Sequence, residues 1–281
     1  MKLRSLAGRR AVNLSATLLM GLATLLVLLP LGIIFYHIIK MGFSSISLDF
    51  FTNIPQPTGM PGGGMANGIA GSAIMICMAS LVGIPVGIFG AIYLTEYGTG
   101  RLATVIRFSA DVLSGIPSII TGMVAYSLLV VPMKGFSAMA GSFALALIMI
   151  PIVLRTTEEQ LKMVPVSLRE ASLALGVPMW RTTLKVTLRS ALTGVVTGIL
   201  LATARVAGET APLLFTALGN QFWSKKLTEP MAALPLQIFN FAIAPYEDWH
   251  RLAWGGALVL VVLMFGLSLT ARWMGRSGRS Q

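Results

Sequence analysis

The chain has 281 residues, of which 55% are hydrophobic and only 11% are charged, and its formal net charge is +11. A soluble domain usually carries about 25% charged residues, so this composition excludes an ordinary soluble protein and indicates an all-α polytopic membrane protein. One cysteine cannot form a disulfide framework, and the two histidines lie far apart, so the sequence contains no cluster with metal-ligand spacing.

Six apolar runs divide the chain. The first, residues 14–39, follows four basic residues, but it is longer than the roughly 7–15 residues of a signal-peptide core, and no small-residue cleavage pattern follows it. We therefore interpret it as a retained membrane helix. Each later run approaches or exceeds the roughly 20 residues needed to cross a bilayer, and the fourth is expected to continue as helix into the polar segment after it. The sequence predicts six transmembrane helices, the other five at 69–94, 108–132, 137–154, 191–218 and 252–273.

The basic residues are distributed unevenly between the two sides of the predicted spans. With the N-terminus inside, 15 Lys and Arg residues fall on the inner side and 5 on the outer side. Such a bias predicts a multi-pass protein of the inner, or plasma, membrane with both termini in the cytoplasm. It also accounts for the positive net charge by contact with the lipid bilayer, so no nucleic-acid partner is expected.

Asp111 and Arg155 lie near the inner ends of the third and fourth spans. We expect Asp111 to lie near Arg107 and to have a structural role. Arg155 ends an apolar run four residues after Pro151. It is interpreted either as a basic anchor on the inner side or as part of a substrate path.

The segment between the fourth and fifth spans contains a short predicted helix. Ser167 and Glu170 have capping-box spacing, and Gly176 followed by Pro178 marks a sharp end. Helical spacing places an apolar stripe on one face of this short helix, and such a face needs a surface to pack against. That surface is either the membrane interface or a soluble partner, and the spacing alone leaves both open. The stripe comprises Leu168, Ala171, Ser172 and Leu175.

The fifth predicted span contains two charged residues, Arg205 and Glu209. Each costs roughly 2.5–3.5 kcal/mol to insert, and four residues apart they would share one helix face. They are either a self-neutralising pair or part of a path for an anion, in which Arg205 supplies a planar fork of donors and Glu209 holds it or exchanges with it. The order Arg before Glu is the weaker one for a helical pair, which favours the path. Pro212 is expected to break the helix just beyond them.

Glu170-Ala171-Ser172, Gly176, Val186 and Leu188 together resemble the EAA loop of type-1 ABC-transporter permeases. The pattern departs from that loop at Ser172, where the family has Ala, and at Arg189, where it has Pro. The resemblance implies that the short helix is a coupling helix that docks on an ATPase. It implies ATPase-coupling roles for five residues, Ser167, Glu170, Ala171, Ser172 and Gly176.

Longer stretches, such as "AIYLTEYG", "PIVLRTTEEQLKMVP" and "ARVAGETAPLLFTALGNQFW", resemble the permeases of phosphate-importing ABC transporters. The resemblance implies a permease subunit that carries inorganic phosphate and has no catalytic residues, metal or cofactor of its own. The expected partners are a similar but non-identical second permease, a dimeric ATPase that binds Mg-ATP, and a periplasmic phosphate-binding protein. The expected substrate-path residues are Arg205, Glu209 and Arg155.

The predicted organisation has three parts. Residues 1–66 hold the N-terminal tail, the first span and an outer loop, residues 67–275 form the permease domain, and residues 276–281 form a cytoplasmic tail. A permease for another oxyanion or small solute is an alternative, as is an ATP-independent secondary transporter. An intramembrane enzyme is disfavoured because no nucleophile and base stand in a recognisable pattern.

Overall fold

The computed structural model describes residues 6–57, 60 and 62–277. Within these residues the chain is helical, and the only β-type contact is an isolated bridge between Leu218 and Met231. The predicted all-α class is therefore confirmed. The outermost residues of the two predicted tails, 1–5 and 278–281, lie outside the described residues.

Five helical segments are long and apolar enough to cross a membrane, and a bent pair makes a sixth if it counts as one span. The main helices are α1 (Leu6–Phe43), α3 (Ala66–Ile92), α7 (Ala138–Lys162), α10 (Leu188–Ala207) and α13 (Glu247–Ser277). Single turns of π-helix extend α3 and precede α10, namely η1 (Tyr93–Tyr97) and η3 (Thr183–Thr187). As predicted, the fourth span continues as helix into the polar segment, to Lys162.

The shorter helices lie between these spans. They are α2 (Leu48–Thr52), α4 (Arg101–Gly115), α5 (Ser118–Ala125), α6 (Val131–Met133), α8 (Val166–Ala174), α9 (Met179–Thr182), α11 (Ala211–Thr216) and α12 (Leu234–Ala242), with a third π-helical turn, η2, at Tyr126–Val130.

The prediction of one continuous third span at 108–132 is wrong. The chain bends by 108° between Arg101–Gly115 and Ser118–Met133. The bend lies at Ile116 and Pro117, where Ile116 adopts an extended conformation (φ −72°, ψ 132°). A proline has no amide hydrogen and disfavours the helical conformation of the residue before it, so α4 ends here and α5 begins in a new direction.

The fifth span is displaced from its predicted position at 191–218. It runs over Met179–Ala207, and residues 211–216 form the separate helix α11. The helix ends at Gly208, before Pro212, which occupies the first turn of α11, where a missing amide hydrogen costs no hydrogen bond. The apolar composition continues across this break, and for that reason hydropathy alone could not locate it.

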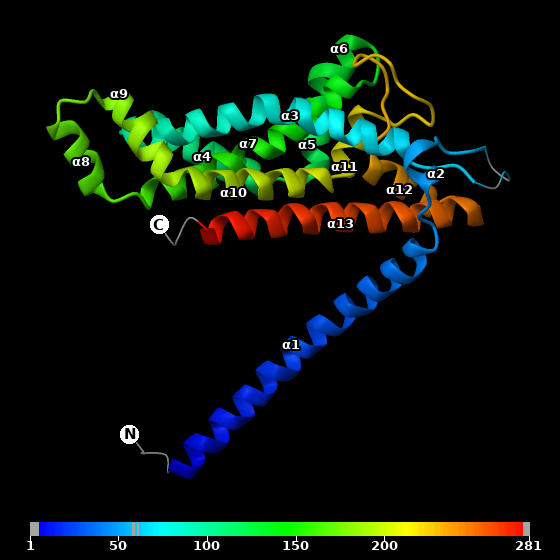
Figure 1. Ribbon diagram of the computed structural model, residues 1–281, viewed down its shortest axis with the longest axis horizontal. Coiled ribbons are helices and arrows are strands. Elements are labelled where there is room, and N and C mark those ends of the chain that lie inside the picture. The colour runs from blue at the N-terminus through cyan, green and yellow to red at the C-terminus, as the bar shows by residue number, and fades with distance from the viewer. Residues whose placement is uncertain (1–5, 58–59, 61, 278–281) are drawn as a thin grey trace.

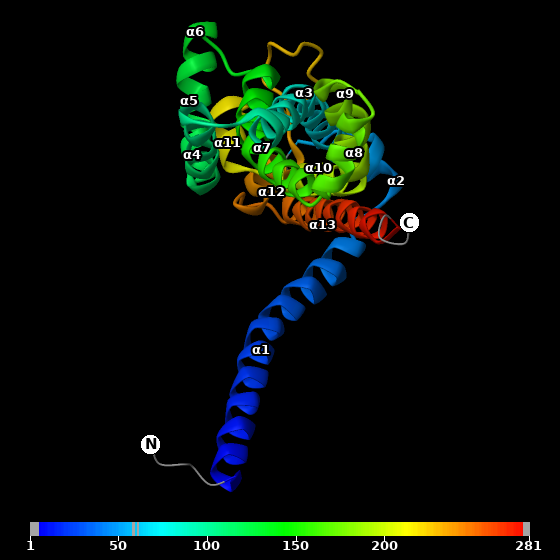
Figure 2. The ribbon, with the colours of Figure 1, turned by 90° about the vertical axis from the view of Figure 1, so that its left-hand side faces the viewer.

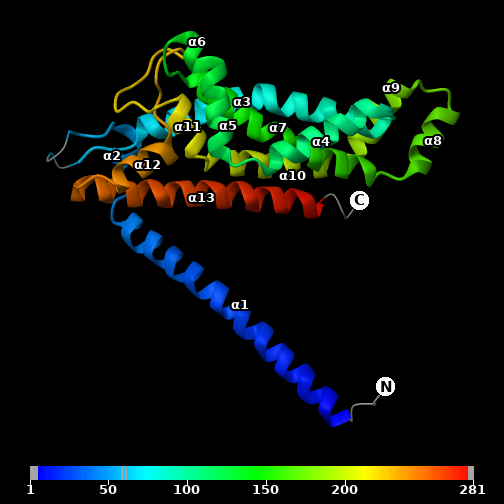
Figure 3. The same cartoon turned by 180° about the vertical axis from the view of Figure 1, so that it is seen from behind.

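The spans α3, α7, α10 and α13 run side by side along the long axis of the molecule (Figure 1). Helices α8 and α9 project at one end of this bundle, while α2 and α12 lie at the other (Figures 1 and 3). Only the C-terminal end of α1 meets the bundle, and the rest of this helix points away from it (Figure 2).

The bundle is closely packed where α3 meets α7. A Cβ atom added at Gly87 would lie 2.8 Å from Cβ of Val153, so only glycine allows the two helices to approach this closely. Met75, Leu145 and Met149 are fully buried beside this contact and form one core with residues of α10, α11 and α12. The two helices are therefore held at fixed positions along this contact. The end of the bundle that carries α8 is here called its inner end.

Candidate functional site

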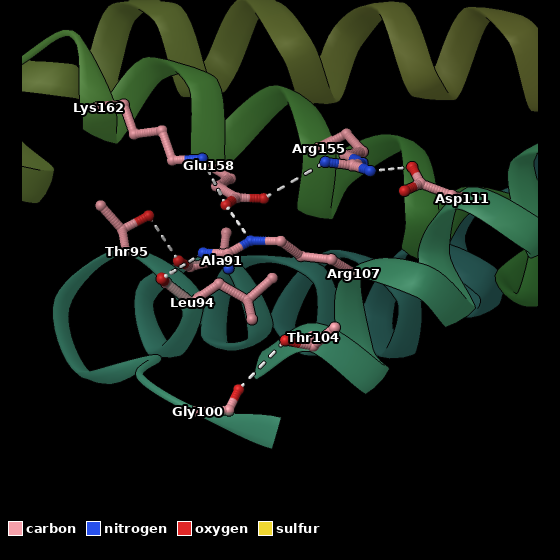
Figure 4. Close-up of polar contacts among 10 residues, drawn as sticks. All are labelled: Ala91, Leu94, Thr95, Gly100, Thr104, Arg107, Asp111, Arg155, Glu158 and Lys162. Atoms are coloured by element: carbon pink, nitrogen blue, oxygen red, sulfur yellow. Dashed lines mark hydrogen bonds and ion pairs between the residues drawn. The ribbon is translucent and has the colours of Figure 1, made fainter. Parts of the chain in front are cut away.

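A group of five charged side chains joins α4 to α7 and is here called the inner charge cluster (Figure 4). At its centre lies Glu158, whose side chain is 1% exposed. Its Oε1 accepts hydrogen bonds from Arg107 Nε at 2.9 Å and from Lys162 Nζ at 2.6 Å. A buried carboxylate is stable only when it is paired, and the bond from Arg107 joins α4 to α7, while the bond from Lys162 lies within α7. The cluster comprises Arg107, Asp111, Arg155, Glu158 and Lys162.

Arg155 lies between the two carboxylates of the cluster. Its guanidinium pairs with Asp111, and its Nη1 lies 3.8 Å from Oε2 of Glu158. Asp111 lies one helical turn from Arg107 on α4, near it as expected, but the two are not partners, because Arg107 pairs with Glu158. Since the side chains of Arg155 and Asp111 are 34% and 57% exposed, this pair can open toward solvent. Arg155 can then bind an anion in place of Asp111.

Arg107 also connects the cluster to α3. Its Nη2 donates a 2.9 Å hydrogen bond to the carbonyl oxygen of Leu94 in η1 (Figure 4). One guanidinium therefore binds the backbone of η1 and the carboxylate of α7 at the same time. The inner ends of α3, α4 and α7 meet at this side chain.

The prediction that Arg205 and Glu209 share one helix face is wrong. Helix α10 ends at Ala207, so Glu209 lies in the connection to α11. Within the described part of the chain, neither side chain forms an ion pair or a hydrogen bond. Arg205 is exposed and occupies the last turn of α10, where the negative end of the helix dipole favours a cation. A self-neutralising pair is therefore absent from this conformation.

The C-terminal end of α10 lies beside the middle of α13. A Cβ atom at Gly208 would lie 3.3 Å from Cε of Met264, a residue near the middle of α13. Hydrocarbon cannot solvate a guanidinium at this depth. The exposed surface around Arg205 must therefore face water or another protein chain, and it is suited to attract an anion.

Helix α8 forms where the short helix was predicted, but not with the predicted cap. Its N-cap is Pro165 and no side chain caps it, so Ser167 lies within the first turn and the predicted capping box is wrong. Pro165 ends the preceding turn and has the extended ψ of 137° that starts a helix. The C-terminal prediction is confirmed: Gly176 has a φ of +77°, and its amide donates to the carbonyl oxygen of Leu173.

The residues of the predicted apolar stripe of α8 differ in their burial. Ser172 is buried and its hydroxyl lies 2.8 Å from that of Thr182. Leu168 and Leu175, by contrast, are 46% and 83% exposed. The exposed side also carries Glu170 and Ala171. Helix α8 thus turns one polar residue toward its own chain and leaves an apolar surface uncovered.

Sequence reasoning missed two members of the inner charge cluster, Glu158 and Lys162. A signal was present, because Arg155, Glu158 and Lys162 are three and four residues apart and lie on one face of a helix. The fourth span was expected to continue as helix into this segment, but the spacing of these three charges was not examined.

Comparison with known proteins identifies relatives of the whole chain. It is 48% identical, over 92% of its length and 85% of the other, to the protein named phosphate transport system permease protein PstA from Yersinia pestis. Among solved structures, it resembles the MetNI methionine ABC transporter (TM-score 0.57, 19% identity, 74% of this chain and 91% of the other). It also resembles a bacterial ABC transporter involved in alginate import (TM-score 0.58, 15% identity, 96% of each chain). These two likenesses show the fold.

The family model described as binding-protein-dependent transport system inner membrane component matches residues 83–277. This range contains α8, the inner charge cluster and Arg205. The chain belongs to the family of inner membrane components of binding-protein-dependent transport systems.

Proposed function

We propose that this chain is the membrane permease subunit of an ATP-driven phosphate importer. The observation that carries the proposal is the 48% identity, over 92% of the chain, to a phosphate transport system permease. The fold of ABC-transporter permeases and the exposed arginines of the bundle agree with this role. As a permease, the chain moves its substrate without making or breaking a covalent bond.

The phosphate path passes two arginines, the exposed Arg205 and the partly exposed Arg155. Arg205 lies deep in the bundle with no carboxylate partner among the described residues, and Arg155 lies nearer the inner end in an openable pair with Asp111. A guanidinium binds a phosphate oxyanion through two parallel N–H···O bonds. The anion would leave Arg205 for Arg155 and displace Asp111 there. Glu209, which would repel phosphate if it were fixed beside the path, acts by transient pairing with Arg205.

A dimeric ATPase docks on α8. The exposed Leu168, Leu173 and Leu175 supply the apolar contact, with Glu170 and Ala171 beside them. Ser167 extends this surface at the first turn, Ser172 holds the helix to its own chain, and Gly176 ends it. Mg-ATP is bound and hydrolysed on that partner, and the resulting motion of α8 switches the access of the bundle.

The surface around Arg205 is completed by a similar, non-identical permease, and a periplasmic phosphate-binding protein docks on the opposite end of the bundle from α8. The distribution of Lys and Arg places α8 in the cytoplasm. The N-terminal end of α1 and the C-terminal end of α13 lie toward the α8 end of the molecule (Figure 1), which supports a cytoplasmic location for both termini.

Uptake by the reconstituted transporter tests this function. We expect proteoliposomes that contain both permeases, the ATPase and the phosphate-binding protein to accumulate labelled phosphate only when ATP is supplied. Excess sulfate should not compete. Uptake by the permeases without the ATPase would identify a secondary transporter, and competition by another oxyanion would identify a different substrate.

A further inference from the structure

Helix α8 is joined to the membrane bundle by one charged side chain, Arg169. Its Nη1 lies 3.2 Å from Oε1 of Glu96, and its Nη2 donates a 2.7 Å hydrogen bond to the carbonyl oxygen of Leu161. Glu96 belongs to η1 at the end of α3, and Leu161 lies in the last turn of α7. One guanidinium thus connects α8 to the inner ends of two membrane spans.

The contact between Arg169 and Glu96 is largely shielded from water. The two side chains are 19% and 4% exposed. An exposed ion pair contributes roughly 0–1 kcal/mol to stability and separates readily. Separating a buried pair is costly, because each charge is then left without a partner. We therefore expect a displacement of α8 to move Glu96 with it instead of breaking the contact.

Glu96 lies in a segment that also binds the inner charge cluster. Two residues before it, the carbonyl oxygen of Leu94 accepts the 2.9 Å hydrogen bond from Arg107, and Arg107 in turn binds Glu158. The segment η1 is one turn of π-helix, a rare form that occurs frequently at functional sites. Its i→i+5 bonding can revert to the α-helical pattern and shift the residues that follow. The path from Arg169 to the cluster therefore passes through a segment whose backbone bonding differs from that of the helix before it.

We propose that Arg169 is a positioning residue that transmits the motion of α8 to the inner charge cluster through Glu96 and η1. The proposal rests on the proposed function, in which an ATPase docks on α8. When the ATPase moves α8, Arg169 moves Glu96, η1 changes its bonding, and Arg107 is displaced relative to Glu158. The pair of Arg155 and Asp111 then opens or closes with the state of the ATPase.

The test uses the complete transporter in proteoliposomes and measures the number of phosphate ions taken up per ATP hydrolysed. Arg169→Gln and Glu96→Gln should each lower this ratio roughly 10-fold, a coupling loss of the size found for residues that link sites. The ATPase should remain bound and its hydrolysis rate should stay within about 2-fold, because the exposed face of α8 is intact. The double variant should be no worse than the worse single variant, since both remove the same contact.

Arg181→Gln is the matched control. Arg181 is an exposed arginine on the same side of the molecule, and its guanidinium lies over the ring of Trp180. The Arg181→Gln variant also removes one positive charge, but it does not touch η1. We therefore expect the number of phosphate ions taken up per ATP hydrolysed to stay unchanged. Arg169→Lys, which keeps the charge but not the fork of donors, should give an intermediate ratio.

Three results would overturn the proposal: an unchanged ratio in Arg169→Gln, loss of the bound ATPase from that variant, or additive effects in the double variant. Failure of all the Arg169 and Glu96 variants to accumulate in the membrane would also overturn it, because the contact would then serve folding. The unmodified transporter separates these results from the proposed function. If it takes up no phosphate with ATP, the proposed function itself fails, whatever the variants do.

Discussion

Arg107 on α4 donates a 2.9 Å hydrogen bond from its Nε to Oε1 of Glu158, a carboxylate buried on α7. The two residues are 51 positions apart in the sequence, and their contact joins α4 to α7. Lys162 binds the same oxygen from the next turn of α7. Glu158 therefore contributes to the position of α4, together with the pair of Asp111 and Arg155.

Replacement of Glu158 by Gln should destabilise the protein. The amide cannot accept as strong a bond from the two cations, and the expected loss is roughly 1–3 kcal/mol, because water partly screens Arg107 and Lys162. The measurement is the midpoint of thermal unfolding in detergent. Glu159→Gln is the control, since Glu159 is the exposed neighbour on the same helix and should leave the midpoint unchanged. Equal midpoints for the two variants would contradict the role of Glu158.

Arg155 and Asp111 should respond differently to neutralisation. Arg155→Gln removes a cation from the proposed path, and we expect phosphate uptake to fall at least about 10-fold, the effect of losing a charge-assisted bidentate contact. Asp111→Asn removes only the competing carboxylate and should change uptake by less than about 3-fold, as for an exposed pair. Initial rates of uptake over a range of phosphate concentrations provide the measurement. If both variants lose the same activity, Arg155 and Asp111 form a structural pair.

The role of Arg205 is tested by removing its charge together with that of Glu209. If Arg205 only neutralised Glu209, the double variant Arg205→Gln with Glu209→Gln would transport normally. Because the two side chains are not paired, we expect the double variant to be as inactive as Arg205→Gln alone. Arg205→Lys should be weak, since Lys lacks the bidentate fork. Uptake of labelled phosphate is measured in cells without other phosphate transporters, with membrane levels compared. Full uptake by the double variant would remove Arg205 from the path.

Gly176→Val should uncouple the ATPase. The residue has a φ of +77°, and an added Cβ would meet no atom within 4 Å, so the cost is that of a left-handed backbone alone, roughly 1–2 kcal/mol. The end of α8 should rearrange while the bundle stays folded. Copurification of the ATPase in mild detergent is the measurement. Gly135→Val is the control, because that site is equally open and its φ is not in the left-handed range. Normal copurification with Gly176→Val would refute the docking role of α8.

The orientation of the chain is tested by reporter fusions. A fusion after Gln281 should report the cytoplasm, and a fusion within residues 44–61 should report the opposite side, because the positive-inside rule places α8 inside. A third fusion within residues 221–229, between α11 and α12, serves as a second outer point. Identical reports from the first two positions would show that the number of spans is wrong.

The sequence was informative where local chemistry decides the structure. Hydropathy located the long helices, and the Gly176-Val177-Pro178 stretch predicted the end of α8, because a left-handed residue there needs glycine. The sequence was uninformative where a helix breaks within an apolar run. Ile116-Pro117 and Gly208 break helices without a change in hydropathy, so two spans were predicted with wrong boundaries. The partners of Arg155 and Arg107 were also out of reach, since they depend on how α4 lies against α7.

Helix α1 packs against α13, although about 200 residues separate the two helices in the chain. A Cβ atom at Gly42 would lie 2.7 Å from Cβ of Leu258, and the rings of His37 and Trp254 are 5.9 Å apart. At a synthesis rate of about 5–20 residues per second, about 10–40 s pass before α13 follows α1 out of the ribosome. During that interval α1 resides in the bilayer without its neighbour. Its apolar surface must therefore be compatible with lipid for the whole time that the rest of the chain is being inserted.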